Sequence, residues 1–410
     1  MPSTRNARYI DVLKLPYVPL TFLSALTGRS AYALVILPLL FAVQATTGSV
    51  ATAGIAVAAY GVTASFLAPL RAQIIDRHGR RLVLLLLAVA FGGMLMALSV
   101  GALAEWSGLT MVVLAGLAGS VAPPLGPAMR VAWAELAREP ALLRTALSFD
   151  AVVEELLYLV GPAAAGLALV VIEPGLVLLV PAVLVILGTV LFVSSPVIRN
   201  TPHRQNAFRS SSALSAAQRV PLLGNLHFLG LLMPALVAGL VSGNLTIAIP
   251  AAFPGTAGAA AAGIVLGLFA GGSAVGGLLF GALRVPGRAR FQIIAIAGIL
   301  VLFQSAVGLT GNAVWMAMTV VAAGAFFSPV MIVAYFAAND FGGEDRKTES
   351  TTWVNTSHNV GAAIGSALAG MVIQVAGVNA SFLTAGGIAV LVLVAAFVLA
   401  SRRIEEPSPR

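Results

Sequence analysis

Long apolar stretches alternate with short polar connections along almost the whole chain. A helix needs about 20 apolar residues to cross the ~30 Å hydrocarbon core of a bilayer, because its backbone polar groups must be satisfied internally there. Twelve stretches meet this length, so the pattern predicts an all-α membrane protein with twelve transmembrane helices. The predicted spans are 18–44, 49–71, 82–104, 109–133, 146–172, 175–194, 226–252, 259–283, 291–309, 313–337, 350–376 and 379–400.

A polar, arginine-rich segment divides these spans six and six. We therefore expect an N-terminal six-helix bundle over residues 1–194 and a cytoplasmic linker over 195–225. A C-terminal six-helix bundle with a short cytoplasmic tail would follow over 226–410. Ala53-Gly54-Ile55 recurs as Ala262-Gly263-Ile264 in the corresponding span of the second half. Such matches favour an internal duplication, as in transporter folds that are built from repeats.

The positive charges predict the orientation of the chain. Every Lys and Arg except Arg29 falls in or beside a terminus or an even-numbered connection, whereas the odd-numbered connections carry only Glu105 and Glu173 as charged residues. Cytoplasmic loops of membrane proteins carry an excess of Lys and Arg. We therefore expect a multi-pass protein of the cell membrane with both termini in the cytoplasm.

Composition excludes several classes of function. Hydrophobic residues make up 59% of the chain and charged residues only 9%, against roughly 25% charged residues in a soluble domain. The net charge of +8 is spread over short loops, so it does not form the basic face of a nucleic-acid-binding protein. The chain has no cysteine, no G-x-x-x-x-G-K-[ST] phosphate loop and no H-E-x-x-H metal motif. We expect no enzyme activity, no cofactor and no metal site.

One connection carries a specific signature. Residues 71–81, after the second span, read RAQIIDRHGRR. This segment resembles the major facilitator superfamily signature G-x-L-x-D-R-x-G-R-R; the matching residues are Asp76, Arg77, Gly79, Arg80 and Arg81. The resemblance implies the major facilitator fold, in which two pseudo-symmetric six-helix bundles transport a small-molecule substrate across the lipid bilayer. We expect the protein to act as a monomer.

The same signature implies a gate on the cytoplasmic side. A carboxylate at a helix end, here Asp76, can accept hydrogen bonds from the exposed N-terminal amides of another helix, and nearby arginines can hold it in place. The resemblance also implies that Glu135 and Arg144 belong to this charge relay. A solvated helix end is the alternative reading of Glu135.

Two further segments resemble the twelve-helix drug and sugar efflux branch of the superfamily, which includes drug:proton antiporters. Gly161, Pro162 and Gly166 match the helix-five signature G-P-x-x-G-G, although Ala165 replaces one glycine. Packing of small residues between helices is the alternative explanation. Residues 355–361, NTSHNVG, are similar to helix eleven of that branch.

Four charged residues lie clearly inside predicted spans rather than at their ends, and inside a span such groups are costly and usually functional. They are Arg29, Asp150, Glu154 and Glu155. Asp150 and Glu154 are four residues apart and share a helical face, whereas Glu155 points about 100° away. We expect Glu154 or Glu155 to pair with Arg29. The pair either neutralises Arg29 permanently or contains a carboxylate that exchanges a transported proton.

The second half of the chain has polar rather than acidic residues in its spans. Asn244, Asn355, His358 and Asn359 can hydrogen-bond a substrate or a neighbouring helix, and His358 can also titrate. Among the aromatic residues, Tyr32, Tyr158 and Trp353 are the candidates for the substrate cavity.

The sequence thus favours proton-coupled efflux of small apolar or amphipathic molecules by alternating access of two bundles. The direction of transport rests on the resemblance to the efflux branch. A sugar or nucleoside transporter, facilitated or proton-coupled, is the alternative within transport. A non-transporting receptor or a membrane-embedded enzyme is the alternative from another class.

Overall fold

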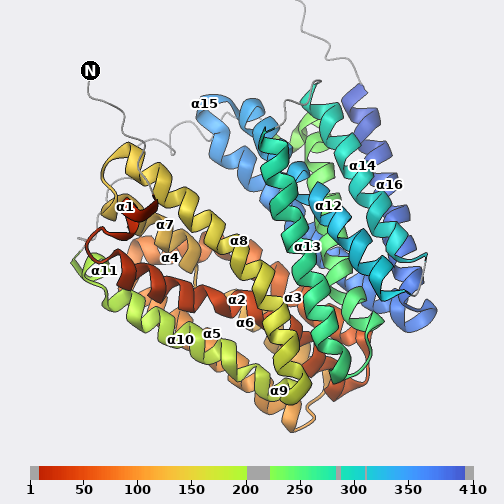
Figure 1. The fold of residues 1–410 in the computed structure, drawn as a ribbon, viewed down its shortest axis with the longest axis horizontal. Coiled ribbons are helices and arrows are strands. Elements are labelled where there is room, and N and C mark those ends of the chain that lie inside the picture. The colour runs from red at the N-terminus through yellow and green to blue at the C-terminus, as the bar shows by residue number, and fades with distance from the viewer. Residues whose placement is uncertain (1–8, 201–221, 283–287, 310–311, 402–410) are drawn as a thin grey trace, which may run out of the picture. The chain divides into compact units, whose positions relative to one another are not determined.

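The computed structural model describes residues 9–200, 222–282, 288–309 and 312–401, and the structure within these ranges is helical (Figure 1). Within them, eleven helices are long and apolar enough to cross a membrane. The bent pair α3 (Val50–Phe66) and α4 (Ala68–His78), counted as one span, brings the number to twelve. The prediction of an all-α protein with twelve membrane spans is therefore confirmed.

The chain divides into two compact units. The first comprises Met1–Ala213 together with Phe253–Gly267, and the second comprises Leu214–Ala252 together with Leu268–Arg410. The remaining helices of the first unit are α1 (Tyr9–Leu13), α2 (Val18–Thr47), α5 (Arg80–Leu103), α6 (Gly108–Val121), α7 (Leu125–Leu136), α8 (Pro140–Val171), α9 (Pro174–Val177), α10 (Leu179–Ser194) and α11 (Pro196–Asn200).

In the first unit, α2 packs against α10, and both contact α5 (Figure 1). The backbones of α2 and α10 come together at Gly28 and Gly188, where a Cβ on Gly188 would collide with the backbone of Gly28. Small residues of this kind let membrane helices approach closely and gain van der Waals contact. Trp133, Phe91 and Phe192 are the largest fully buried side chains of this unit.

Two spans of the first unit are interrupted near prolines. Proline lacks the backbone N–H that continues a helical hydrogen-bond ladder. The axis bends by 43° between α3 and α4, where Pro69 occupies the first turn of α4. Pro123 and Pro124 separate α6 from α7 within one span. Both breaks leave backbone groups that must find partners inside the protein.

The second unit is built on α12 (Leu226–Ala252), α14 (Ala289–Val307), α15 (Ala313–Ala376) and α16 (Val378–Ser401), preceded by the short helix η2 (Leu222–Gly224). The helix α13 (Thr256–Ala282) begins in the first unit and ends in the second. Gly239 and Gly243 of α12 pack directly on the backbone of α15.

One connection differs from the sequence prediction. A loop containing Arg346 was expected between the spans 313–337 and 350–376, but α15 is helical over all 64 of its residues. A straight helix of that length would measure about 96 Å, so it supplies two spans, Ala313–Phe341 and Glu349–Ala376. The apolar pattern marked where the chain leaves the membrane, but a polar stretch can be helical as readily as a loop.

Candidate functional site

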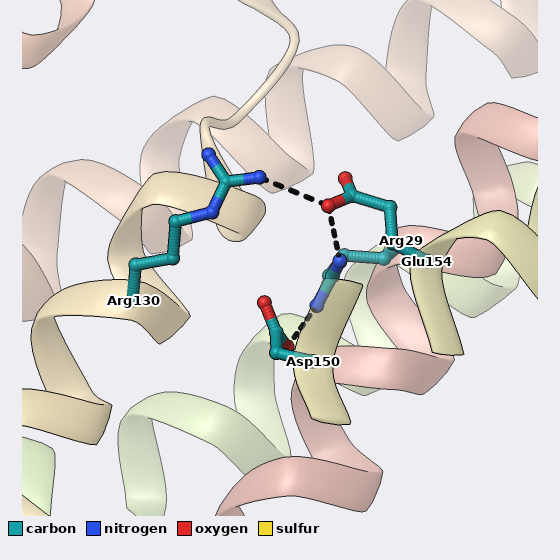
Figure 2. Close-up of polar contacts among 4 residues, drawn as sticks. All are labelled: Arg29, Arg130, Asp150 and Glu154. Carbon is teal, nitrogen blue, oxygen red and sulfur yellow. Dashed lines mark hydrogen bonds and ion pairs between the residues drawn. The ribbon is translucent and has the colours of Figure 1, made fainter. Parts of the chain in front are cut away.

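Four charged residues of the first unit form a continuous cluster (Figure 2). Nη1 of Arg29 donates a hydrogen bond of 2.7 Å to Oδ1 of Asp150, and Nη2 of Arg29 lies 2.9 Å from Oε2 of Glu154. The same Glu154 oxygen accepts a hydrogen bond of 2.9 Å from Nη2 of Arg130. The cluster contains two positive and two negative charges, so it is neutral as a whole.

Three helices bring these groups together. Asp150 and Glu154 lie one turn apart on the same face of α8, as their spacing predicted. Arg29 comes from the middle part of α2, and Arg130 comes from α7. The side chains of Arg29 and Asp150 are only 3% and 2% exposed, whereas those of Glu154 and Arg130 are 26% and 53% exposed. The cluster therefore runs from a buried end to an accessible end.

Glu154 also faces a pocket of about 190 Å³. Its walls combine charged, aromatic and apolar groups, contributed by Arg29, Tyr32, Pro123, Pro124, Leu125, Gly126, Pro127, Glu154, Leu157 and Tyr158. Two aromatic residues predicted for the cavity, Tyr32 and Tyr158, thus lie beside the charged cluster. The adjacent carboxylate, Glu155, is exposed and is not part of the wall.

The break between α6 and α7 forms one side of this pocket. The hydroxyl of Tyr32 donates a hydrogen bond of 2.5 Å to the carbonyl oxygen of Pro123. Nη1 of Arg71 donates hydrogen bonds of 2.9 Å to the carbonyl oxygens of Gly119 and Ser120 in the last turn of α6. All three carbonyl oxygens therefore accept a side-chain hydrogen bond at the break. Those of Gly119 and Pro123 also accept one from the amides of Ala122 and Leu125, at 3.3 and 2.9 Å.

Arg71, which lies beside the second connection, has a structural role that the sequence analysis did not predict. Its side chain is buried, and its Nη2 also donates to the carbonyl oxygen of Ala64, near the bend between α3 and α4. A positive charge suits this place because the C-terminal ends of helices carry partial negative charge. The nearby Pro69 and the Pro123-Pro124 pair were the sequence signals for carbonyls that need a donor.

The structure describes some, but not all, of the residues predicted to form the cytoplasmic gate. Nη2 of Arg80 lies 2.9 Å from Oε1 of Glu135, and both side chains are partly exposed. Gly79 joins α4 to α5 with a φ of +95°, a conformation that few residues other than glycine adopt. Arg77 and Arg81 are exposed. The side chains of Asp76 and Arg144 lie outside the described part of the structure.

The helix-five residues lie at close helix contacts. A Cβ on Gly161 would meet the Cβ of Ala33 on α2 at 2.5 Å. Gly166 packs on the backbone of Ala259, and Gly263 packs on the carbonyl oxygen of Pro162, both between α8 and the first half of α13. These contacts give the three glycines a packing role, which was the alternative to an exchange-specific role.

The candidate substrate-binding residues of the second unit are not among the residues that line the described pocket. Asn244 is buried and donates hydrogen bonds to the side chain and backbone of Ser381, while Gln304 donates to Asn244. Nδ1 of His358 lies 3.3 Å from Oδ1 of Asn359, and the His358 ring packs edge-on against Phe327. Trp353 is half-buried and Asn355 is exposed.

Comparisons with known proteins show which family and which solved structures this chain resembles. The sequence profile of the Major Facilitator Superfamily matches residues 19–253 and 231–410. A variant of the nucleoside transporter NupG is similar in structure, with a TM-score of 0.76, 14% identity and coverage of 93% of this chain and 99% of that one. A bacterial homologue of the lysosomal transporter Spinster, inward-facing and occupied, has a TM-score of 0.67 and 12% identity, with coverage of 94% and 96%.

A bacterial homologue of the iron transporter ferroportin, in an inward-facing state, has a TM-score of 0.70 and 14% identity, with coverage of 94% of this chain and 99% of that one. Comparison with curated proteins finds no match. At these identities the solved structures support the fold alone, whereas the profile covers nearly the whole sequence. The chain belongs to the Major Facilitator Superfamily, and it is a multi-pass membrane transporter of a small molecule rather than an enzyme.

Proposed function

We propose that this protein is a proton-coupled transporter of small amphipathic molecules in the cell membrane, with both termini in the cytoplasm. Two bundles, residues 1–194 and 226–410, would expose the site alternately to the two sides, with residues 195–225 as a cytoplasmic linker. The observation that carries the proposal is the position of Glu154. Its carboxylate joins the pocket wall to two arginines.

This position suits a group that binds and releases a proton. Protonation of Glu154 removes the negative charge that holds it between Arg29 and Arg130, so the gain of a proton changes the ion pairs of three helices. Asp150 stays with Arg29 at the buried end of the cluster. The guanidinium of Arg29 therefore keeps one counter-charge when Glu154 carries the proton, which avoids the large cost of an unpaired buried charge.

The composition of the pocket wall supports an amphipathic substrate. Leu157 and the prolines are apolar, whereas Tyr32 and Tyr158 carry hydroxyl groups on flat rings. Its volume of about 190 Å³ is below the ~300–1,000 Å³ of sites for drug-sized ligands, which favours a small substrate. The resemblance to the efflux branch supports export as the direction.

A nucleoside is the second candidate substrate. NupG, a nucleoside transporter, is similar in fold over 93% of this chain. The two tyrosines beside Glu154 could stack on a base and hydrogen-bond a ribose. Uridine should then stabilise the purified protein against heat, because a ligand that binds only the folded state raises its apparent stability.

A flux experiment on variants of the adjacent residues Glu154 and Glu155 tests proton coupling. Substrates that stabilise the purified protein would be loaded into proteoliposomes, and their flux measured with and without a pH gradient. We expect Glu154→Gln to bind substrate but to lose gradient-driven flux. Glu155→Gln is the matched control, because it makes the same chemical change outside the pocket wall. An equal response to the gradient in the wild type and in Glu154→Gln would refute the proposal.

A further inference from the structure

Positively charged groups gather at one wall of the pocket beside Glu154. Arg29 lines it directly, and Arg130 reaches the same Glu154 oxygen from α7. Although Nη2 of Arg29 is 2.9 Å from Glu154, its angles do not make a hydrogen bond, and this buried nitrogen has no hydrogen-bond partner among the described residues. A guanidinium has five donors in a planar fork. Both terminal nitrogens of Arg29 thus face carboxylates, and Nη2 would become available to a ligand in the pocket when Glu154 is protonated.

The beginning of α7 adds to this positive wall. Leu125, Gly126 and Pro127, in the first turn of α7, line the pocket, and no side chain caps the N-terminus of this helix. Pro127 has no N–H, and the N–H of Leu125 donates to the carbonyl oxygen of Pro123, so Gly126 supplies the remaining amide of the first turn, at the end that the helix dipole makes positive. The N-terminus of a discontinuous membrane helix is therefore suited to an anionic group of a substrate.

The opposing negative end of the broken span is compensated. Carbonyl groups at the end of α6 would make the same break attractive to a cation. Arg71 donates hydrogen bonds to two of these carbonyl oxygens, and Tyr32 donates to that of Pro123. The carbonyl end of the break is thus occupied, and the N–H of Gly126 is the amide of the first turn of α7 that remains for a ligand among the described residues.

We infer that the pocket binds the carboxylate of a small organic acid, between Arg29 and the first turn of α7, and that the acid is transported together with a proton on Glu154. This inference rests on the proposed function and names its substrate class. Leu157, Tyr158 and the prolines would contact the apolar part of the acid. A cationic substrate is disfavoured because it would meet two arginines and a helix N-terminus.

Charge balance gives the direction of the coupling. The four-residue cluster is neutral when Glu154 is ionised, and a bound carboxylate would leave one uncompensated negative charge. A proton on Glu154 restores neutrality and frees Arg29 for the substrate, while Arg130 remains beside Glu154. The other ionisable groups near Glu154 are Asp150, Glu155 and Tyr158 on α8. Acid and proton therefore bind together and do not displace one another. Unlike the exchange expected of an antiporter from the efflux branch, an exported acid would thus leave the cell together with a proton.

A thermal-shift panel on the purified full-length protein tests the substrate class. Propionate, hexanoate, benzoate and phenylacetate would be compared with their amides and with the corresponding primary amines. We expect one or more acids to raise the melting temperature, and its amide and amine to have no comparable effect. Equal or greater stabilisation by the amide or the amine, or no stabilisation by any acid, would overturn the inference.

Two variants locate the carboxylate. A Cβ on Gly126 would meet only Oε1 of Glu154, at 3.7 Å, so Gly126→Ala should fold normally while narrowing the first turn of α7. Arg29→Gln combined with Asp150→Asn removes the buried charge pair together and leaves no orphaned charge. Both should weaken binding of the acid by about tenfold or more, the range for loss of a charge-assisted hydrogen bond. Arg346→Gln, which removes the same charge from the surface, is the matched control. Unchanged affinity in both pocket variants would refute this placement.

Proton uptake separates this inference from the proposed function. Addition of a binding acid to the protein in weakly buffered solution should take up at most about one proton per site, because the two ligands are linked. Glu154→Gln should bind the acid without proton uptake. Proton release, or no change, in the wild type would overturn co-binding. Gradient-driven flux of neutral molecules without binding of any acid would refute the substrate class and leave the proposed function intact.

Discussion

Nη1 of Arg29 donates a hydrogen bond of 2.7 Å to Oδ1 of Asp150, and the two residues are 121 positions apart. Both side chains are almost completely buried, so neither charge can turn to water. Loss of one partner from such a pair typically destabilises a protein by about 3–5 kcal/mol, whereas joint replacement by neutral groups costs far less. The pair therefore joins α2 to α8 at the buried end of the cluster.

The first prediction follows from this pair. Asp150→Ala should sharply lower the yield of folded protein and its melting temperature, because Arg29 then has only the partly exposed Glu154 as a counter-charge. Arg29→Gln with Asp150→Asn should recover most of that loss. Size-exclusion profiles and thermal unfolding in one detergent would measure both. A double variant no more stable than Asp150→Ala would argue against this account.

The second prediction concerns the hydrogen bonds that the buried Arg71 side chain donates to carbonyl oxygens at the helix breaks. Arg71→Met should destabilise the first unit by about 2–5 kcal/mol, since several buried carbonyl oxygens lose a donor at once. Arg71→Lys should rescue it only partly, because one ammonium cannot reproduce the planar fork. Thermal unfolding would rank the stabilities of the wild type and the two variants. Arg81→Met, at an exposed site, is the control. Equal stability of the lysine variant and the wild type would show that charge alone suffices.

The third prediction tests the gate. Arg80 and Glu135 are partly exposed, and such pairs contribute only about 0–1 kcal/mol to stability. Arg80→Glu should therefore leave expression nearly unchanged but impair transport, as should Asp76→Asn. Adding Glu135→Arg to Arg80→Glu exchanges the two charges and should restore part of the flux. Full activity of both single variants would remove this pair and Asp76 from the mechanism.

The fourth prediction tests orientation. Because the chain has no cysteine, single cysteines can be labelled without background. Glu105→Cys and Arg138→Cys, both at exposed positions, should react with an impermeant thiol reagent from opposite sides of the membrane. Arg138→Cys is expected to react from the cytoplasmic side. Labelling of both cysteines from the same side would contradict the inside-positive topology.

The sequence predicted the fold more fully than the site. Long apolar runs reveal membrane spans because the bilayer demands satisfied backbone groups over a fixed thickness. The shared face of Asp150 and Glu154 was also predictable, since helical spacing is local. The choice of partner for Arg29 was not, because it depends on how α2 and α8 pack. The sequence favoured Glu154 or Glu155, and the structure pairs Arg29 with both Asp150 and Glu154.

Arg130 and Arg71 show the same limit in two ways. Near the end of a span, an arginine can extend towards the membrane surface or turn inward to an acceptor, and the sequence pattern is the same for both. Arg130 turns to Glu154, while Arg71 turns to carbonyl groups exposed by breaks in two helices. Only the positions of those breaks in space reveal that these acceptors are available.

The partners of Arg71 also constrain how the protein is made. The nascent chain enters the membrane in order, and the Gly119 and Ser120 carbonyls are synthesised 48 and 49 residues after Arg71. Until α6 has been inserted, the guanidinium must remain at the lipid headgroups, because it would be costly in the hydrocarbon without those acceptors. The second span can therefore reach its final depth only after the fourth has arrived. Final packing of the second span therefore depends on insertion of the fourth, because the buried side chain of Arg71 needs acceptors on α6.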